Sequence, residues 1–407
     1  MSVIYHALGL NLHQPPGNLW QLLETSPEEA KSILFAYDRI ARFLWSHEDL
    51  ARVHLSLSGS LLETLSDPQF QKAVYGTVDC GSMLWHLQNR QIIDILGTAF
   101  YHPVLPLIPR EDWRAHVFNW KKLGGHLFWR DEFSGFWPPE LGFTMELIPL
   151  LKEAGYSYVI VDSEHVEPVT SMSDAERRYR PHLARHDGIE MVVIVRDREL
   201  SNEIANGGCY GSFLAGLEHR LDGLVNPLVT TCTDGENGAW YRNTNTRENF
   251  WGGFYQGLLE DARDTGRIRP VFIPNYIREH GVFGEVTVHT GAWNTEWHDG
   301  KDFSQWAGGE LQAKALERIR KVSLSMQSAT KDAPQREIGD QEEQSMYLAY
   351  QRLLRAETSC NFYWGDTWVE RANRDLDEAE STLARYQAKK YLMDTDAGWL
   401  LPDQRVS

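Results

Sequence analysis

Short apolar runs alternate with helix-like segments through about residue 290 of the chain. Helical spacing fills intervals such as 28–46 and 144–154, and the apolar runs read VIYHALGLNLH, VHLSLSG, IIDILGTAF, FSGFW, YSYVIVD, MVVIVRD and NPLVTTCTDG. Strands that alternate with helices predict a parallel sheet or barrel. Seven such strands predict an α/β fold close to the eight-stranded TIM barrel but one strand short, a distorted (β/α)7 barrel.

The pattern changes after about residue 305, where long helical segments follow one another without strand runs. These segments read GGELQAKALERIRKVSLSMQSA, EEQSMYLAYQRLLRAETS and VERANRDLDEAESTLARYQAKKYL, and ATKDAPQREIGD is typical of a flexible connection between two of them. Spacing predicts one shared face of the first helix for Leu311, Ala315, Ile319 and Val322. We therefore predict a catalytic barrel over residues 1–304 and a C-terminal helical domain over 305–407 that contributes to the cleft.

Charge and cysteine usage disfavour several classes of protein. The 57 acidic and 40 basic side chains give a net charge of −17, which disfavours a nucleic-acid or anionic-membrane partner. No apolar run approaches the ~18–20 residues of a spanning helix, and the N-terminus lacks the basic and small-residue features of a signal peptide. The four cysteines lie far apart without a CxxC pair. We expect a cytoplasmic protein without a disulfide framework.

Aromatic content is high, with 15 Trp, 16 Tyr and 16 Phe among the 407 residues. Aromatic faces pack cores, and they also stack on the flat apolar faces of sugar rings. Each single tryptophan is therefore open to both interpretations. We find no cluster of metal ligands and no phosphate-binding glycine loop, so we expect neither a metal nor an organic cofactor.

Polar residues follow each strand run, and in parallel α/β barrels the active site lies at the C-terminal ends of the strands. The run ends include His13 and Gln14, His102, Trp137 and Glu140, VDSEH, RDREL, and Asp234 with Glu236. His13 alone is also explained as a buried histidine with its hydrogen bonds satisfied, Asp234 as a turn residue before glycine, and Trp137 as core packing. The ring as a set is harder to explain by structure alone.

Glu140 stands out because it follows an aromatic strand end and two prolines, in SGFWPPELGF. Proline cannot donate to a sheet ladder, so the strand is expected to stop and the turn to hold Glu140 at the mouth. A buried acid beside Trp137 is costly unless it is paired or used. Two carboxylates across an aromatic cleft are the layout of a glycoside hydrolase, in which one acid attacks and the other donates a proton.

With these residues in view, the chain resembles glycoside hydrolase family 57, the retaining α-glucan-active family. Five blocks carry the resemblance in the family's order: LNLHQPPG, QIIDILGTAFYHPVLPLIP, GFWPPELGF, TTCTDGENGAW and AETSCNFYWGDTW. The resemblance implies a seven-stranded β/α barrel followed by a helical region. It also implies that Glu140 is the nucleophile and Asp234 the general acid/base.

The resemblance extends to substrate contacts. It implies that His13 lines the sugar subsite beside the cleaved bond and that Trp364 reaches the cleft from the helical region, whereas Trp293 is added on its chemistry. The predicted substrate-binding residues are His13, Gln14, His102, Trp137, Glu236, Trp293 and Trp364.

One position departs from the pattern of the glucanotransferase-like members and of some amylases. They have Glu after the tyrosine pair of the second block, whereas this chain has His102, and its fourth block is similar to the amylopullulanase-type members. We therefore expect hydrolysis of α-1,4 bonds in starch- or glycogen-type glucans, with α-1,6 bonds as a second candidate.

Three alternatives stay open. A 4-α-glucanotransferase or a branching-type transglycosylase would use the same scaffold, although the chain is short for a branching enzyme. A catalytically inactive glucan-binding protein would keep the fold. A metal-dependent polysaccharide deacetylase is disfavoured, because the first strand lacks an Asp pair and no His-x3-His pair occurs near the second or third block.

Overall fold

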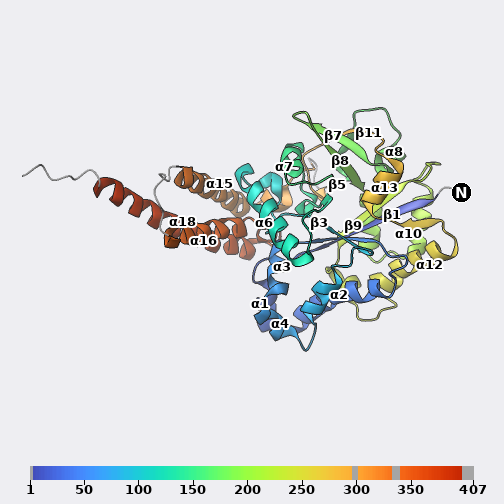
Figure 1. The fold of residues 1–407 in the computed structure, drawn as a ribbon, viewed down its shortest axis with the longest axis horizontal. Coiled ribbons are helices and arrows are strands. Elements are labelled where there is room, and N and C mark those ends of the chain that lie inside the picture. The colour runs from blue at the N-terminus through green and yellow to red at the C-terminus, as the bar shows by residue number, and fades with distance from the viewer. Residues whose placement is uncertain (1–2, 296–300, 332–339, 397–407) are drawn as a thin grey trace, which may run out of the picture. The chain divides into compact units, whose positions relative to one another are not determined.

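The chain divides into two compact units in the computed structural model, which describes residues 3–295, 301–331 and 340–396 (Figure 1). The first unit holds residues 1–106 and 113–303, and the second holds 107–112 and 304–407. In Figure 1 the strands lie at the centre of the first unit, with helices such as α2, α10, α12 and α13 outside them. No helix among the described residues is both long enough and apolar enough to cross a membrane.

Seven parallel strands of the first unit pair in a circuit. They are β1 (Ile4–Leu12), β2 (Val53–Leu57), β3 (Ile93–Leu96), β4 (Gly135–Phe136), β5 (Tyr158–Asp162), β8 (Ile189–Arg196) and β9 (Leu228–Asp234). Pairing runs from β1 through β2 to β3, and from β4 through β5 and β8 to β9 and back to β1. A bridge between Gly97 and Phe136 joins β3 to β4. All seven predicted strands are confirmed, and the fold is the expected TIM-like barrel.

Four shorter strands extend this sheet. They are β6 (Val166–Pro168), β7 (His182–His186), β10 (Ile268–Pro270) and β11 (Gly284–Val288). Strand β7 runs antiparallel to β8 and pairs with β11, which in turn pairs with β6, whereas β10 pairs with the start of β1. These short strands lie in stretches that the apolar runs did not mark, so the sequence did not predict them.

Helices lie between successive strands of the circuit and after β9, its last strand. They are α1 (Asn18–Thr25), α2 (Pro27–Trp45), α3 (Gly59–Ser66), α4 (Pro68–Val74), α5 (Cys80–His86), α6 (Arg110–Phe128), α7 (Ile148–Glu153), α8 (Asp174–Tyr179), α9 (Arg198–Ala205), α10 (Tyr210–Glu218), α11 (Gly238–Arg242), α12 (Gln256–Asp264) and α13 (Ile273–His280). Helix α2 shows why they form: Pro27 occupies the first turn, acidic Glu28 and Glu29 follow, and an apolar stripe from Ala30 to Leu44 is buried.

The barrel interior is closely packed around Trp137, which is fully buried. A Cβ atom at Gly9 of β1 would come within 2.8 Å of both the Trp137 ring and the Cys232 sulfur atom. Glycine at this position therefore lets the indole ring pack directly against the β1 backbone. A larger side chain would force a shift in a region that is already at interior packing density.

The second unit is helical. Its helices are α14 (Ser304–Ala307), α15 (Glu310–Lys331), α16 (Asp340–Ala356), α17 (Cys360–Tyr363) and α18 (Asp366–Asp396). The connection between α15 and α16, residues 332–339, lies outside the described residues. The prediction of three long helices is confirmed.

One detail of the predicted apolar face of α15 is wrong. Ala315, Ile319 and Val322 are buried, but Leu311 is 39% exposed. The inward position in the first turn is taken instead by Gln312, whose side-chain amide donates to the carbonyl groups of Gln305 and Phe362.

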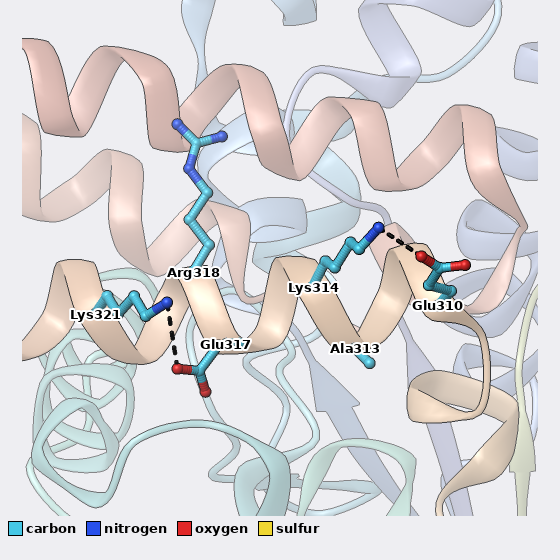
Figure 2. Close-up of a pocket in the computed structure, with 6 residues that line it drawn as sticks. All are labelled: Glu310, Ala313, Lys314, Glu317, Arg318 and Lys321. Atoms are coloured by element: carbon cyan, nitrogen blue, oxygen red, sulfur yellow. Dashed lines mark hydrogen bonds and ion pairs between the residues drawn. The ribbon is translucent and has the colours of Figure 1, made fainter.

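The exposed face of α15 is charged, as Figure 2 shows. Lys314 pairs with Glu310 at 2.5 Å and Lys321 pairs with Glu317 at 3.5 Å, which are helical neighbours one turn apart. Arg318 points the other way and pairs with Asp377 and Glu380 of α18 at 2.5 and 2.7 Å. These pairs belong to the helical unit itself, and they suit a solvated helix face better than a sugar site.

Candidate active site

Glu140 occupies a tight turn immediately after β4. Strand β4 ends at Phe136, and Pro139 opens a single 3-10 turn, Pro139–Leu141. Glu140 and Leu141 have φ angles of 55° and 49°, in the left-handed region that non-glycine residues rarely adopt. The two prolines and this turn restrict the backbone, so the Glu140 carboxylate leaves the strand end in one direction with 16% of its side chain exposed.

Two neighbours hold the Glu140 carboxyl group. Trp293 donates from its indole Nε1 to Glu140 Oε2 at 2.7 Å, and the Trp293 backbone N–H donates to the Glu140 carbonyl at 2.9 Å. His102 Nδ1 lies 3.7 Å from Oε1. His102 also has a left-handed backbone, with φ of 59°. Each oxygen of the carboxylate therefore faces a different ring, which fixes its orientation.

His13 and His102 stack face to face, with ring centroids 3.9 Å apart and an interplanar angle of 9°. His13 Nδ1 lies 2.8 Å from the Ser58 hydroxyl, and the His13 backbone N–H donates to Glu236 Oε1 at 2.9 Å. Burial lowers the pKa of His102 to about 3, and burial together with His102 lowers the pKa of His13 well below its usual value. Both rings are therefore neutral near pH 7, which is what allows them to stack.

Asp234 ends β9, directly opposite Asn11 of β1 in the parallel register. Asn11 Nδ2 donates to Asp234 Oδ1 at 3.1 Å, and Asn237 Nδ2 donates to Oδ2 at 2.9 Å. Burial raises the pKa of Asp234, while Asn237, Asn11 and Arg196 oppose that rise. A raised pKa lets a carboxyl group keep its proton to higher pH than a free aspartate, which suits a general acid.

Glu236 is a second carboxyl group on the same loop and is 1% exposed. Burial and then the negative charge of Asp234 raise the pKa of Glu236 well above its usual range. One of its oxygens accepts the His13 backbone N–H. Glu236 links the loop after β9 to the end of β1 through this hydrogen bond, and its proximity to Asp234 disfavours two negative charges on the loop.

The structure brings most of the predicted residues into one connected group at the C-terminal ends of the strands. Contacts link Glu236 to His13, His13 to His102, His102 to Glu140, and Glu140 to Trp293. The edge of Trp293 meets Trp137, with centroids 6.1 Å apart and an angle of 84°.

Gln14 and Trp364 stand apart from these contacts. Gln14 accepts from Asn18 at 2.8 Å and from the Ser60 hydroxyl through its backbone carbonyl at 2.7 Å. Trp364 belongs to the helical unit, where it is 56% exposed and meets Tyr363 edge-on. Sugar contacts by all seven predicted substrate-binding residues stay predictions, as does the contribution of the helical unit to the cleft.

Arg196 and Asp162 were not predicted as site residues, although VDSEH and RDREL marked their strand ends. Their ion pair spans 2.6 Å, and both side chains are buried. The Arg196 guanidinium lies 5.6 Å from the centroid of the Trp293 ring. A polar residue at the last position of each of two barrel strands was the available signal; that they pair was not readable from the sequence.

No group of three or more His, Cys, Asp or Glu side chains is placed to hold a metal ion within the part of the chain that the structure describes. The carboxyl groups of the site are instead held by indole, amide and imidazole groups.

Comparison with known proteins finds relatives that are named as an alpha-amylase and a 4-alpha-glucanotransferase. The chain is 27% identical over 203 residues to an alpha-amylase of Pyrococcus abyssi and, over the same length, to a 4-alpha-glucanotransferase of Thermococcus kodakarensis. Each match covers 49% of this chain and 28% of the relative, so the chain spans less than a third of either protein.

The crystal structure of a family 57 branching enzyme from Thermococcus kodakaraensis has the same fold. It superposes with a TM-score of 0.70 at 14% identity, covering 95% of this chain and 91% of that one. The model described as Glycosyl hydrolase family 57 matches residues 24–289, a range that includes Glu140 and Asp234 but not His13 or Trp364. The chain belongs to glycosyl hydrolase family 57.

Proposed function

We propose that this protein is a retaining glycoside hydrolase of α-glucans, cleaving α-1,4 bonds of starch- or glycogen-type chains, with α-1,6 bonds as a second candidate. One observation carries the proposal. The two carboxyl groups at the barrel rim differ in environment: Glu140 accepts the Trp293 indole at 2.7 Å, whereas burial raises the pKa of Asp234. A retaining mechanism needs two carboxyl groups in different environments, because one must be ionised to attack and the other must carry a proton.

Glu140 is the nucleophile in this proposal. Its carboxylate attacks the anomeric carbon and forms a β-glycosyl-enzyme, while Asp234 donates its proton to the leaving oxygen. Water then attacks the anomeric carbon while Asp234 takes its proton, the bond to Glu140 breaks, and the α-configured product leaves with the Glu140 carboxylate and the Asp234 acid restored. The left-handed turn and the Trp293 hydrogen bond support this role, since they hold one carboxylate oxygen in place and leave the other beside His102.

Asp234 is supported as acid/base by its two amide donors. Asn11 and Asn237 bind one oxygen each, which orients the carboxyl group without adding charge. Neutral His13 and His102 offer imidazole groups beside Glu140 that are suited to sugar hydroxyls. None of the four cysteines, all of them among the described residues, forms a disulfide bond, which supports a reducing compartment such as the cytoplasm.

Product analysis tests the proposal. Wild type, Glu140→Gln and Asp234→Asn are incubated separately with maltoheptaose and with pullulan, and binding of maltoheptaose is measured by calorimetry for all three. We expect short maltooligosaccharides from wild type alone, with turnover lost by about four orders of magnitude in Glu140→Gln and binding retained. Cleavage of pullulan as well would assign the α-1,6 bond.

Other outcomes contradict specific parts of the proposal. A ladder of products both longer and shorter than seven glucose units would identify a 4-α-glucanotransferase, and new α-1,6 branch points would identify a branching enzyme. Binding without any product would identify a glucan-binding protein. Full activity in Glu140→Gln would contradict the assignment of Glu140 as the nucleophile, but it would not affect the membership of the chain in family 57.

A further inference from the structure

Arg196 is the last residue of β8 and lies at the rim between β5 and β9. Its backbone pairs with Asp162 on one side and with Thr230 on the other. The side chain is 2% exposed and all three of its nitrogen atoms are bonded. They reach Asp162 Oδ2 at 2.6 Å, the Cys232 carbonyl at 2.8 Å and Asn202 Oδ1 at 3.0 Å. These three hydrogen bonds therefore fix the orientation of the buried Arg196 guanidinium.

Part of this arrangement is structural. Strands β8 and β9 share one register pair, Arg196 with Thr230, and among the described residues β9 has no ladder partner beyond it on that side. The Arg196 guanidinium supplies a donor for the Cys232 carbonyl, and the Ser201 hydroxyl accepts from the Cys232 N–H at 3.0 Å. Side chains thus complete the hydrogen bonding of β9 immediately before Asp234.

The same guanidinium lies near groups that adjoin each member of the proposed catalytic pair, namely Trp293, which donates to Glu140, and the Cys232 carbonyl, two residues before Asp234. It lies 5.6 Å from the Trp293 ring centroid, within the range of a cation–π contact, and Trp293 donates to Glu140. Its positive charge also acts on Asp234, opposing the effect of burial on the pKa of that carboxyl group. One side chain therefore touches the ring that orients the nucleophile and lies within electrostatic reach of the acid.

We propose that Arg196, anchored by Asp162, is a positioning residue that holds Trp293 against Glu140 and places a fixed positive charge beside Asp234. The inference rests on the proposed function, and it adds the link between the two carboxyl groups. Arg196 does not touch the sugar in this account. It acts through Trp293 on orientation and through its charge on the protonation of the acid.

The sign of the charge effect follows from the groups around Asp234. Asn11 and Asn237 are neutral donors, Glu236 is the other acid of the loop, Tyr241 on α11 is a neutral phenol, and Arg196 is the cation. Removing the cation leaves burial unopposed by charge, so the pKa of Asp234 rises further. Asp234 then keeps its proton to higher pH, and the basic limb of kcat/KM moves to higher pH.

The test compares four full-length variants on maltoheptaose from pH 4 to pH 10. Arg196→Met removes the charge, and Arg196→Lys keeps it without the planar fork. Asp162→Asn removes the anchor but leaves the cation, and Glu236→Gln removes the neighbouring titration. We expect kcat to fall about 10- to 100-fold in Arg196→Met. The basic limb of the kcat/KM profile of Arg196→Met should move to higher pH. In Arg196→Lys and Asp162→Asn this limb should stay at the wild-type pH, although kcat should fall in part.

A purely structural role for Arg196 would lower activity at every pH in proportion to the folded fraction, measured by circular dichroism and thermal unfolding, and would leave the limb in place. That result in Arg196→Met would overturn the inference. If the basic limb of the kcat/KM profile disappeared in Glu236→Gln, that limb would belong to Glu236 and not to Asp234. This result would also overturn the inference. Failure of the proposed function is distinct, since wild type would then release no product, or Asp234→Asn would retain full activity.

Discussion

Replacing His102 by glutamate places a second carboxyl group beside Glu140. His102 Nδ1 lies 3.7 Å from Glu140 Oε1, and two negative charges about 4 Å apart repel by about 4 kcal/mol at an effective dielectric constant of about 20. This repulsion corresponds to at most about three pH units, at about 1.36 kcal/mol each. Partial exposure of Glu140 screens the repulsion, so we expect the acid limb of kcat/KM to rise by about one to two units.

The assay is the pH profile of kcat/KM on maltoheptaose from pH 4 to pH 9 for wild type, His102→Glu and His102→Gln. Burial lowers the pKa of His102 to about 3, so the wild-type ring is neutral over this range and glutamine replaces it without a change of charge. Both variants bear the same left-handed backbone, with φ of 59° at this position, and any strain cancels between them. An acid limb in His102→Glu that coincides with that of His102→Gln, in folded protein, would refute the proximity of this group to the nucleophile.

Two further predictions concern the nucleophile's donor and the barrel interior. Trp293→Phe keeps the ring but loses the donor to Glu140, and because a hydrogen bond to a charged group contributes about 1.5–3 kcal/mol, kcat/KM should fall about 10- to 100-fold. Exposed Trp129→Phe is the control, and equal loss in both variants would contradict the assignment. Gly9→Ala would bring a methyl group within 2.8 Å of two interior side chains and should lower the free energy of unfolding in urea by about 1–3 kcal/mol. Gly76→Ala, whose added Cβ has no neighbour within 4 Å, is the matched control. An unchanged urea midpoint in Gly9→Ala would show that the interior side chains shift to accommodate the methyl group without loss of stability.

The barrel strands were predictable because each is a short apolar run that ends in a turn signal. Local patterns of this kind are complete within five to ten residues. The same locality explains the error at Leu311, where helical spacing was right but the neighbouring Gln312 takes the inward position. Strands β6, β7 and β11 were not predicted, because their pairing depends on partners far along the chain.

The site was predictable as a set of strand-end residues but not as a set of contacts. The proline pair predicted that the chain stops after β4, and Glu140 does lie in the turn that follows. The stacking of His13 on His102 and the pairing of Arg196 with Asp162 join residues from different strand ends. Sequence alone carries no signal for such pairs, since they are fixed by strand order and register around the barrel. The roles of these residues rest on the experiments above.

Two junctions in the circuit of strands have few ladder pairs. Strand β4 has two residues and meets β3 through the Gly97–Phe136 bridge, and β8 meets β9 through one register pair. Glu140 follows β4, at the β3–β4 junction, and Asp234 ends β9, at the β8–β9 junction. Neighbouring strands of a barrel separate most easily where the fewest ladder hydrogen bonds must break. We therefore expect the separation of the two carboxyl groups to depend on the side-chain bonds across the rim, such as Arg196–Asp162 and Trp293–Glu140, more than on the ladder bonds of the sheet.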